Sequence, residues 1–131
     1  MSMIFFRQKL HEVITLPPPP KDDMAEALEV EKIVNARTAD QVKSVMDHDQ
    51  DPYFAIKKVI KKYKLEFHPH ELEQILKESV PIITHFKDFY NRKRPHVVLP
   101  KIQTLPSKTN KTPAYPSGHA CQSVIIARYV A

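Results

Sequence analysis

The chain has 131 residues, enough for one domain with its own core, and its 42% hydrophobic and 27% charged residues are ordinary for a globular protein. A net charge of +5 favours an anionic ligand without choosing between phosphate ester, nucleic acid and membrane surface. One cysteine excludes an internal disulfide, and no apolar stretch approaches the roughly 20 residues of a membrane-spanning helix. We therefore expect a soluble protein with no evident signal peptide, whose compartment the composition does not indicate.

Twelve prolines and a single glycine, Gly118, predict an all-α fold. Sheet proteins need many tight turns, and such turns commonly use glycine. A glycine-poor, proline-punctuated chain is instead typical of helices joined by proline-bearing loops. We expect a bundle of about five to six helices, with residues 1–16 as an N-terminal arm, 17–21 as a proline-rich linker and 22–131 as the helical domain.

Three helices are predicted in the first half of this domain. An aspartate can cap the first, over residues 22–36, where apolar side chains recur at helical spacing. Thr38 begins the second, with Gln41 three residues later as in a capping box. Pro52 suits the first turn of the third, which runs to about Tyr63.

Five lysines lie mostly on the outward side of the third helix or just after it, and they form one candidate binding surface: Lys57, Lys58, Lys61, Lys62 and Lys64. They allow a non-catalytic helical module that binds nucleic acid or another anionic partner. We favour a solvated helix face over a nucleic-acid site, because no aromatic stacking pattern accompanies the lysines.

Pro69 opens a long amphipathic helix that we expect to run to Arg94, with Pro81 kinking or splitting it. Pro95 disfavours helical geometry at the residue before it and so sets that end. Residues 96–115 are predicted to be a proline-rich connection, and a last apolar helix follows Gly118.

Two cations near the end of the long helix share a face if the helix continues through both. Lys87 and Arg94 are seven residues apart, which is two helical turns to within about 20°. Their side chains can converge on one anion, with arginine presenting a planar fork to phosphate oxygens and lysine a point charge.

The start of the last helix offers a second anion-binding feature, the sequence Pro116-Ser117-Gly118-His119. A helix N-terminus has free N–H groups and a partial positive charge. Ser117 can donate a hydroxyl, Gly118 lets the backbone approach an anion, and the ring of His119 could give a proton to a leaving oxygen. An ordinary turn with a capping serine explains the same residues without function.

Taken together, Lys-x6-Arg-Pro and a Pro-Ser-Gly-His about twenty residues later resemble the first two of three signature motifs of the phosphatidic-acid-phosphatase type 2/haloperoxidase superfamily. The Leu16–Pro20 segment, a helix break at Arg37-Thr38, and Tyr115 before the second motif are similar to soluble class A bacterial acid phosphatases. The resemblance implies that Lys87, Arg94, Ser117 and the Gly118 amide bind the phosphoryl group. His119 would then be the general acid that protonates the leaving alcohol.

The superfamily's third motif supplies another arginine, the histidine that attacks phosphorus to form a phosphohistidine, and an aspartate that orients it. No such segment follows His119, and the sequence ends twelve residues later. We carry none of the other histidines as nucleophile. The resemblance therefore implies an acid-phosphatase-like domain that is C-terminally incomplete, binds a phosphate-ester substrate and turns it over little or not at all.

A vanadium-dependent haloperoxidase is an alternative, because that group holds vanadate with the same residues; otherwise no cofactor and no metal are expected. If the superfamily's C-terminal helices are absent, the last helix should expose Val124, Ile125 and Ile126. A homo-oligomer that covers this surface is then expected.

Overall fold

The computed structural model describes residue 12 and residues 14–131, and the secondary structure of that part of the chain consists of helices without a strand. The helices that carry the fold are α3 (Asp23–Ala36), α4 (Ala39–Gln50), α5 (Phe54–Tyr63), α6 (Pro69–Tyr90), α7 (Pro95–Val98) and α8 (Gly118–Val130). The predicted all-α class is confirmed. Most of the predicted arm, residues 1–16, lies outside the described residues. No helix in the described part of the chain is both long and apolar enough to cross a membrane.

The first helices begin at the capping residues that the sequence predicts. The side chain of Asp22 accepts a hydrogen bond from the Ala25 amide at 2.9 Å, which caps α3. Thr38 and Gln41 form the reciprocal pair of a capping box at the start of α4, at 2.8 and 3.2 Å. Each bond satisfies a backbone donor that the first helical turn leaves unpaired, so local sequence determines these starts.

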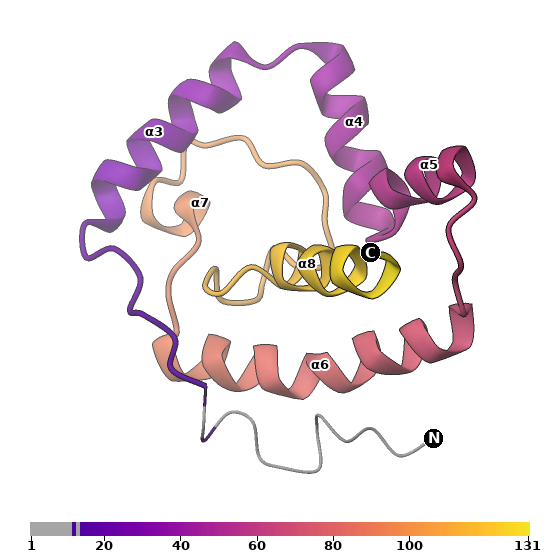
Figure 1. Ribbon diagram of the computed structural model, residues 1–131. Helices are drawn as coiled ribbons and strands as arrows, with labels where there is room; N and C mark the ends of the chain where they lie inside the picture. Colours follow the sequence, from indigo (N-terminus) through magenta and orange to yellow (C-terminus); the bar gives the residue numbers. More distant parts are fainter. Residues whose placement is uncertain (1–11, 13) are drawn as a thin grey trace.

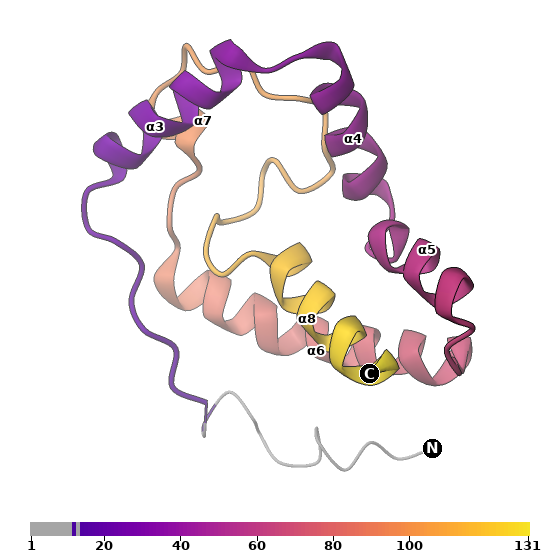
Figure 2. The ribbon, with the colours of Figure 1, turned by 45° about the horizontal axis from the view of Figure 1, so that its top comes forward.

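Helices α3 to α6 follow one another around the rim of the molecule, and α8 lies inside them, packed along α6 (Figures 1 and 2). The chain runs along α8 in the direction opposite to α6, so the end of each helix lies near the start of the other. Tyr129, near the end of α8, donates a hydrogen bond to the carboxylate of Glu71, near the start of α6, at 2.9 Å. This antiparallel pairing directs the C-terminal end of α6 and the N-terminal end of α8 toward the same end of the molecule, and the longer α6 extends past the start of α8.

The buried apolar cluster lies where α6 begins and α8 ends. Leu72 and Ile126 are fully buried and Leu76 nearly so, and partly buried side chains pack around them: Tyr53, Ile56, Phe67, Ile125 and Tyr129. Leu72 and Leu76 are four residues apart and therefore share one face of α6. The expectation that α8 exposes Ile126 is wrong, because α6 covers it. Val124, on another face of α8, is 55% exposed as expected.

Pro81 does not split the long helix, which is continuous from Pro69 to Tyr90. A proline at this position removes the hydrogen bond to the carbonyl of Lys77. Both residues are exposed, so water can bind that carbonyl in place of the missing amide. The buried side of α6, through Leu76, Ser79 and Ile83, continues past the proline.

The long helix ends four residues earlier than predicted. Asn91 adopts a left-handed conformation with φ of 43°, and its amide bonds to the carbonyl of Lys87 at 2.8 Å. Asparagine tolerates this conformation better than most residues and commonly ends helices in it. Arg94 is therefore not on α6. It is extended, as expected before proline, and precedes the short helix α7, which the sequence did not predict.

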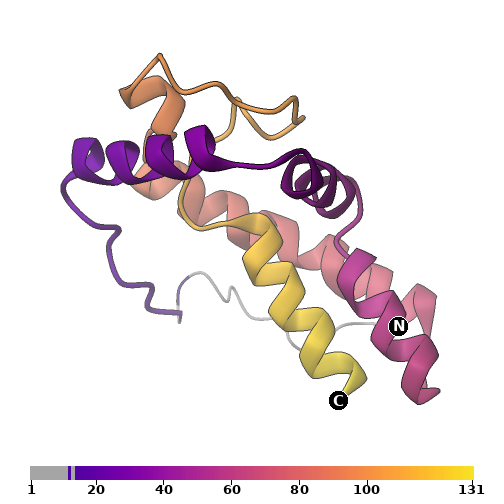
Figure 3. The same ribbon diagram turned by 90° about the horizontal axis from the view of Figure 1, so that it is seen from above.

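Helix α3 packs against α7, and ionic contacts hold it to the residues on either side of α7 (Figure 3). Ala27 is fully buried in α3, where its small side chain permits close approach. The guanidinium of Arg92, only 14% exposed, bridges Asp23 and Glu26, and Lys101 pairs with Glu31 at 2.8 Å. These contacts fix the segment that carries Arg94 relative to α3.

Candidate functional site

Two helix ends that are distant in the sequence lie toward the same end of the fold, away from the buried cluster. They are the last turn of α6, which carries Lys87, and the first turn of α8, which carries Cys121 (Figure 1). Burial raises the pKa of the Cys121 thiol, and the nearby charge of Lys87 partly opposes that rise. The interaction shows that Lys87 faces the start of α8.

Lys87 is half-buried at this junction and donates a hydrogen bond from Nζ to the carbonyl of Pro113 at 2.7 Å. Burial lowers the pKa of Lys87, and the positive charge of Arg94 lowers it further. The two cations therefore lie within electrostatic range of each other although they are not on one helix. Neutralising either charge would relieve this repulsion, and an anion between them would do the same.

The side chain of Arg94 is held by Thr112, the neighbour of the Pro113 that binds Lys87. Its Nε donates to the carbonyl of Thr112 at 2.6 Å, and one Nη donates to the hydroxyl of the same residue at 2.9 Å. Burial lowers the pKa of Arg94, and the negative charge of Asp49 partly opposes that effect. The guanidinium has five N–H donors, so these two bonds leave further donors for another group.

The segment that holds both cations leads directly into α8. The amide of Ala114 donates to the carbonyl of Arg92 at 2.8 Å, which fixes this segment against the connection between α6 and α7. With Thr112 and Pro113 it forms one short stretch whose backbone contacts Lys87, Arg92 and Arg94. Residues 112–114 therefore link Lys87 and Arg94 to the segment that leads into α8.

Ser117 and Gly118 begin α8 as the sequence predicts. The hydroxyl of Ser117 accepts a hydrogen bond from the Ala120 amide at 3.2 Å and caps the helix. Gly118 does not have a positive φ, and a methyl group built on it meets no atom within 4 Å. Neither backbone conformation nor packing among the described residues therefore requires glycine at this position.

His119 lies in the first turn of α8 and contacts the end of α4. Its Nε2 is 3.0 Å from the backbone carbonyl of Asp49 and 3.9 Å from Oδ1 of the same residue. Because a carbonyl oxygen can only accept, Nε2 carries the hydrogen in this contact. In the protonated ring Nδ1 carries the second hydrogen, and the contact with Asp49 leaves that hydrogen available to another group.

Asp49 is the residue of this site that sequence reasoning missed. Besides its contact with His119, its carboxylate accepts a hydrogen bond from the hydroxyl of Ser107 at 3.1 Å and interacts electrostatically with Arg94. Asp49 thus links Arg94, which precedes α7, with His119 in the first turn of α8. Its only sequence signal is an acidic stretch, Asp47 to Asp51, at the end of a predicted helix, and such stretches are usually solvated.

The proline-rich segment before α3 also reaches the site. Tyr115 donates to the carbonyl of Pro17 at 2.5 Å, and Tyr90 donates to the carbonyl of Leu16 at 2.6 Å. The two rings meet edge to face with centroids 5.3 Å apart. One residue from the last turn of α6 and one from the approach to α8 thus hold this segment in place.

The chain matches no family model, no curated protein and no solved structure. Its site is therefore described by its own geometry. Within the described residues, no group of three or more histidine, cysteine, aspartate or glutamate side chains is placed to hold a metal ion.

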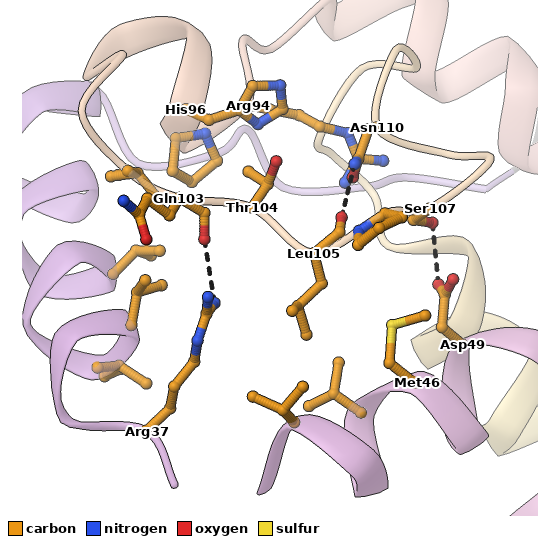
Figure 4. A pocket seen from close by; sticks show the side chains of 18 of the residues that line it. Arg37, Met46, Asp49, Arg94, His96, Gln103, Thr104, Leu105, Ser107 and Asn110 are labelled. Atoms are coloured by element: carbon orange, nitrogen blue, oxygen red, sulfur yellow. Dashed lines mark hydrogen bonds between the residues drawn. The ribbon is translucent and has the colours of Figure 1, made fainter. Parts of the chain in front are cut away.

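A cavity of about 560 Å³ lies beside Arg94, between α3, α4 and residues 102–110 (Figure 4). Arg94, His96 and Asp49 line it together with apolar side chains from α3 and α4. Arg94 and Asp49 thus belong both to the contacts described above and to the lining of this cavity.

Proposed function

We propose that this chain provides the phosphate-binding part of a phosphatase of the phosphatidic-acid-phosphatase type 2/haloperoxidase type that acts on phosphate monoesters. One observation carries the proposal: Lys87 and Arg94 are held by consecutive residues, Pro113 and Thr112, of the segment that leads into Ser117-Gly118-His119. Two half-buried cations and a capped helix start then lie at one end of the fold.

The charge balance of this arrangement favours a tetrahedral anion. Burial lowers the pKa of both Lys87 and Arg94, and the positive charge of Arg94 lowers the pKa of Lys87 further, so both charged forms are less stable here than in water. A phosphate dianion would compensate both charges, and the free N–H groups at the start of α8 would add hydrogen bonds. The space above Gly118 suits close approach of such an oxygen.

In this proposal His119 protonates the leaving alcohol. The carbonyl of Asp49 holds Nε2, and the hydrogen on Nδ1 of the protonated ring passes to the ester oxygen as its bond to phosphorus breaks. The bonding electrons stay on that oxygen, which leaves as the alcohol. Phosphorus at the same time forms a bond to an attacking group that neither motif supplies, so we expect this chain alone to turn over an aryl phosphate little or not at all.

The haloperoxidase alternative uses the same residues, because vanadate has the charge and shape of phosphate. The lysine-rich surface of α5 is less favoured as a functional site. Lys57 pairs with Asp51 at 2.6 Å, and Lys58 and Lys62 lie over the rings of aromatic residues on α5 itself. These lysines therefore have intramolecular partners that account for them without a nucleic acid.

Titration of the full chain with inorganic phosphate and with vanadate, followed by calorimetry and ³¹P or ⁵¹V NMR, tests the proposal. We expect Lys87→Ala and Arg94→Ala each to weaken binding by about tenfold or more, as for loss of a charged hydrogen bond. Lys93→Ala is the matched control, because this exposed cation lies between them in the sequence, and it should change affinity less than twofold. Equal effects of all three substitutions would refute the site.

Hydrolysis of p-nitrophenyl phosphate tests the expectation that this chain alone shows little or no turnover. Hydrolysis by the wild-type chain that survives His119→Ala and is lost on substitution of another histidine would show that the roles are assigned wrongly. Steep salt dependence of nucleic-acid binding that is lost on substitution of the α5 lysines would favour the binding-module alternative instead.

A further inference from the structure

The cavity beside Arg94 is apolar over most of its surface. Its lining includes Ile33 and Val34 from α3, Val45 and Met46 from α4, and Leu105 from the connection before α8. Its volume of about 560 Å³ lies within the range of 300–1,000 Å³ that is typical of pockets for small organic molecules. Transfer of an apolar group from water into such a space is favourable in proportion to the area buried.

Three hydrogen bonds join polar groups of this lining to one another. The guanidinium of Arg37 donates to the carbonyl of Gln103 at 3.0 Å, and the side-chain amide of Asn110 donates to the carbonyl of Leu105 at 2.8 Å. The hydroxyl of Ser107 donates to Asp49, and Figure 4 shows all three bonds as dashed lines. Apolar side chains from α3 and α4 form much of the remaining lining, and a sugar hydroxyl buried against them without a partner is unfavourable.

Arg94 connects this cavity to the proposed phosphate site. Figure 4 shows its side chain beside the cavity, with Arg37 and Asp49 entering from opposite sides of the view. Arg94, Val45 and Leu105 line the same cavity, so a ligand whose phosphate contacts Arg94 has apolar side chains within the same space. A cation at the edge of an apolar space is complementary to an anion that carries an apolar substituent.

We propose that the cavity selects phosphate monoesters whose organic group is an apolar alkyl or aryl chain. The phosphate of such an ester lies at Arg94, and its organic chain lies between α3 and α4. This inference rests on the proposed function, because it uses Arg94 as a phosphate ligand, but it adds a choice of substrate that phosphate binding does not require. Esters with a strongly polar organic group, such as sugar phosphates, gain nothing from this cavity.

An affinity series with the full chain tests the selection. The probes are inorganic, methyl, propyl and hexyl phosphate, with glucose 6-phosphate as the polar comparison, measured by calorimetry. Each fully buried methylene strengthens binding by up to about fourfold, so we expect hexyl phosphate to bind at least about tenfold more tightly than methyl phosphate. Glucose 6-phosphate should bind no more tightly than methyl phosphate. Equal affinities along the alkyl series would overturn the inference.

Two valines of similar exposure, one inside and one outside the cavity lining, test where the alkyl chain binds. Val45 lines the cavity and is 53% exposed, whereas Val59 on α5 is 44% exposed and does not line it. We expect Val45→Gln to remove most of the advantage of hexyl over methyl phosphate while inorganic phosphate binds unchanged, and Val59→Gln to leave the series intact. Ile33→Gln, at a position 70% exposed, gives a second test with little risk to folding.

The outcomes separate this inference from the function it rests on. If inorganic phosphate binds and depends on Lys87, but the alkyl series is flat, the selection is wrong and the phosphate site stands. If neither phosphate nor its esters bind, both are wrong. If hexyl phosphate binds tightly but equally well in the Val45, Ile33 and Val59 variants, its chain lies elsewhere and the cavity assignment is overturned.

Discussion

The imidazole of His119 lies against the backbone carbonyl of Asp49, a residue seventy positions earlier in the chain, with Nε2 and the oxygen 3.0 Å apart. The end of α4 therefore determines how the first turn of α8 presents its ring. The carboxylate of the same aspartate lies 3.9 Å from Nε2 and interacts with Arg94. One residue thus contributes a neutral acceptor that contacts His119 and a negative charge close to Arg94.

Asp49→Asn should increase phosphate affinity, by roughly twofold to tenfold, because it removes a negative charge near Arg94 and leaves the backbone carbonyl in place. Calorimetric titration with phosphate at low salt measures the change, and added salt should reduce it. Asp47→Asn is the matched control, since Asp47 lies on the same helix and pairs with Lys43 at 2.7 Å. Weaker phosphate binding in Asp49→Asn would show that this carboxylate supports the site.

As pH rises, phosphate affinity should begin to fall at a lower pH than it would if the site contained a lysine with the ordinary pKa of 10.5. In the proposed site Lys87 would bind the anion in its charged form. Burial together with Arg94 lowers the pKa of Lys87, so the charge is lost at a lower pH as pH rises. In Arg94→Gln the pKa of Lys87 should rise but stay below 10.5, because burial is the larger cause. NMR titration of the lysine side chains measures both, and an unchanged Lys87 pKa in Arg94→Gln would contradict the proximity of the two cations.

Gly118→Ala separates a ligand-related role of this glycine from a structural one. A methyl group at this position meets no protein atom within 4 Å, and alanine favours helix over glycine, so thermal stability should stay equal or rise by about 0.5 kcal/mol. Phosphate affinity should nevertheless fall severalfold, because the methyl group occupies the space above the helix start. Unchanged affinity for phosphate would place the anion elsewhere.

Arg92→Ala should destabilise the fold by about 1–2 kcal/mol, measured by urea denaturation. The substitution removes the link from the connection after α6 to Asp23 and Glu26 on α3. We expect less than the loss typical of a fully buried ion pair, because the two carboxylates are 41% and 45% exposed and stay hydrated. Lys93→Ala, at an exposed neighbour, should change stability by less than about 0.5 kcal/mol.

Ile126→Ala should cost about 2–5 kcal/mol, because this side chain is fully buried against Leu72 and Leu76. Val124→Ala, two residues earlier and 55% exposed, should cost less than about 1 kcal/mol. Chemical denaturation of both variants measures the difference. Similar losses would mean that α8 does not present Ile126 to α6 as described.

The predicted starts of α3, α4, α6 and α8 and the predicted ends of α3 and α5 agree with the structure. The start of α5 is Phe54 and not Pro52, and the end of α6 is Tyr90 and not Arg94. The caps at Asp22, Thr38 and Ser117 act within three residues, and Pro69 favours a helix start, so no distant contact is needed to recognise them. The end of α6 depends on the left-handed conformation of Asn91, which asparagine permits but does not require. The helical spacing of apolar residues shows that a helix has an apolar face, but it does not show which element covers that face. The pairing of α6 with α8 could therefore not be predicted from it.

The candidate site was predicted by residue type and by resemblance rather than by geometry. The argument that Lys87 and Arg94 share a helical face is wrong, because α6 ends between them. Residues 112 and 113 hold both cations instead, through contacts spanning 18 and 26 residues. The sequence around Asp49 shows only an acidic stretch, because the contacts of this residue with His119 form when α4 and α8 come together. The roles of the five site residues in binding and catalysis stay predictions.

The antiparallel pairing of α6 and α8 separates the buried apolar cluster from the proposed phosphate site. Leu72 and Ile126 lie at one end of the pair, and Lys87 and Ser117 lie at the other. Selection or design can therefore alter the charged end repeatedly while the scaffold keeps its robustness. A protein arranged in this way is well suited to acquire new ligand preferences by a few substitutions.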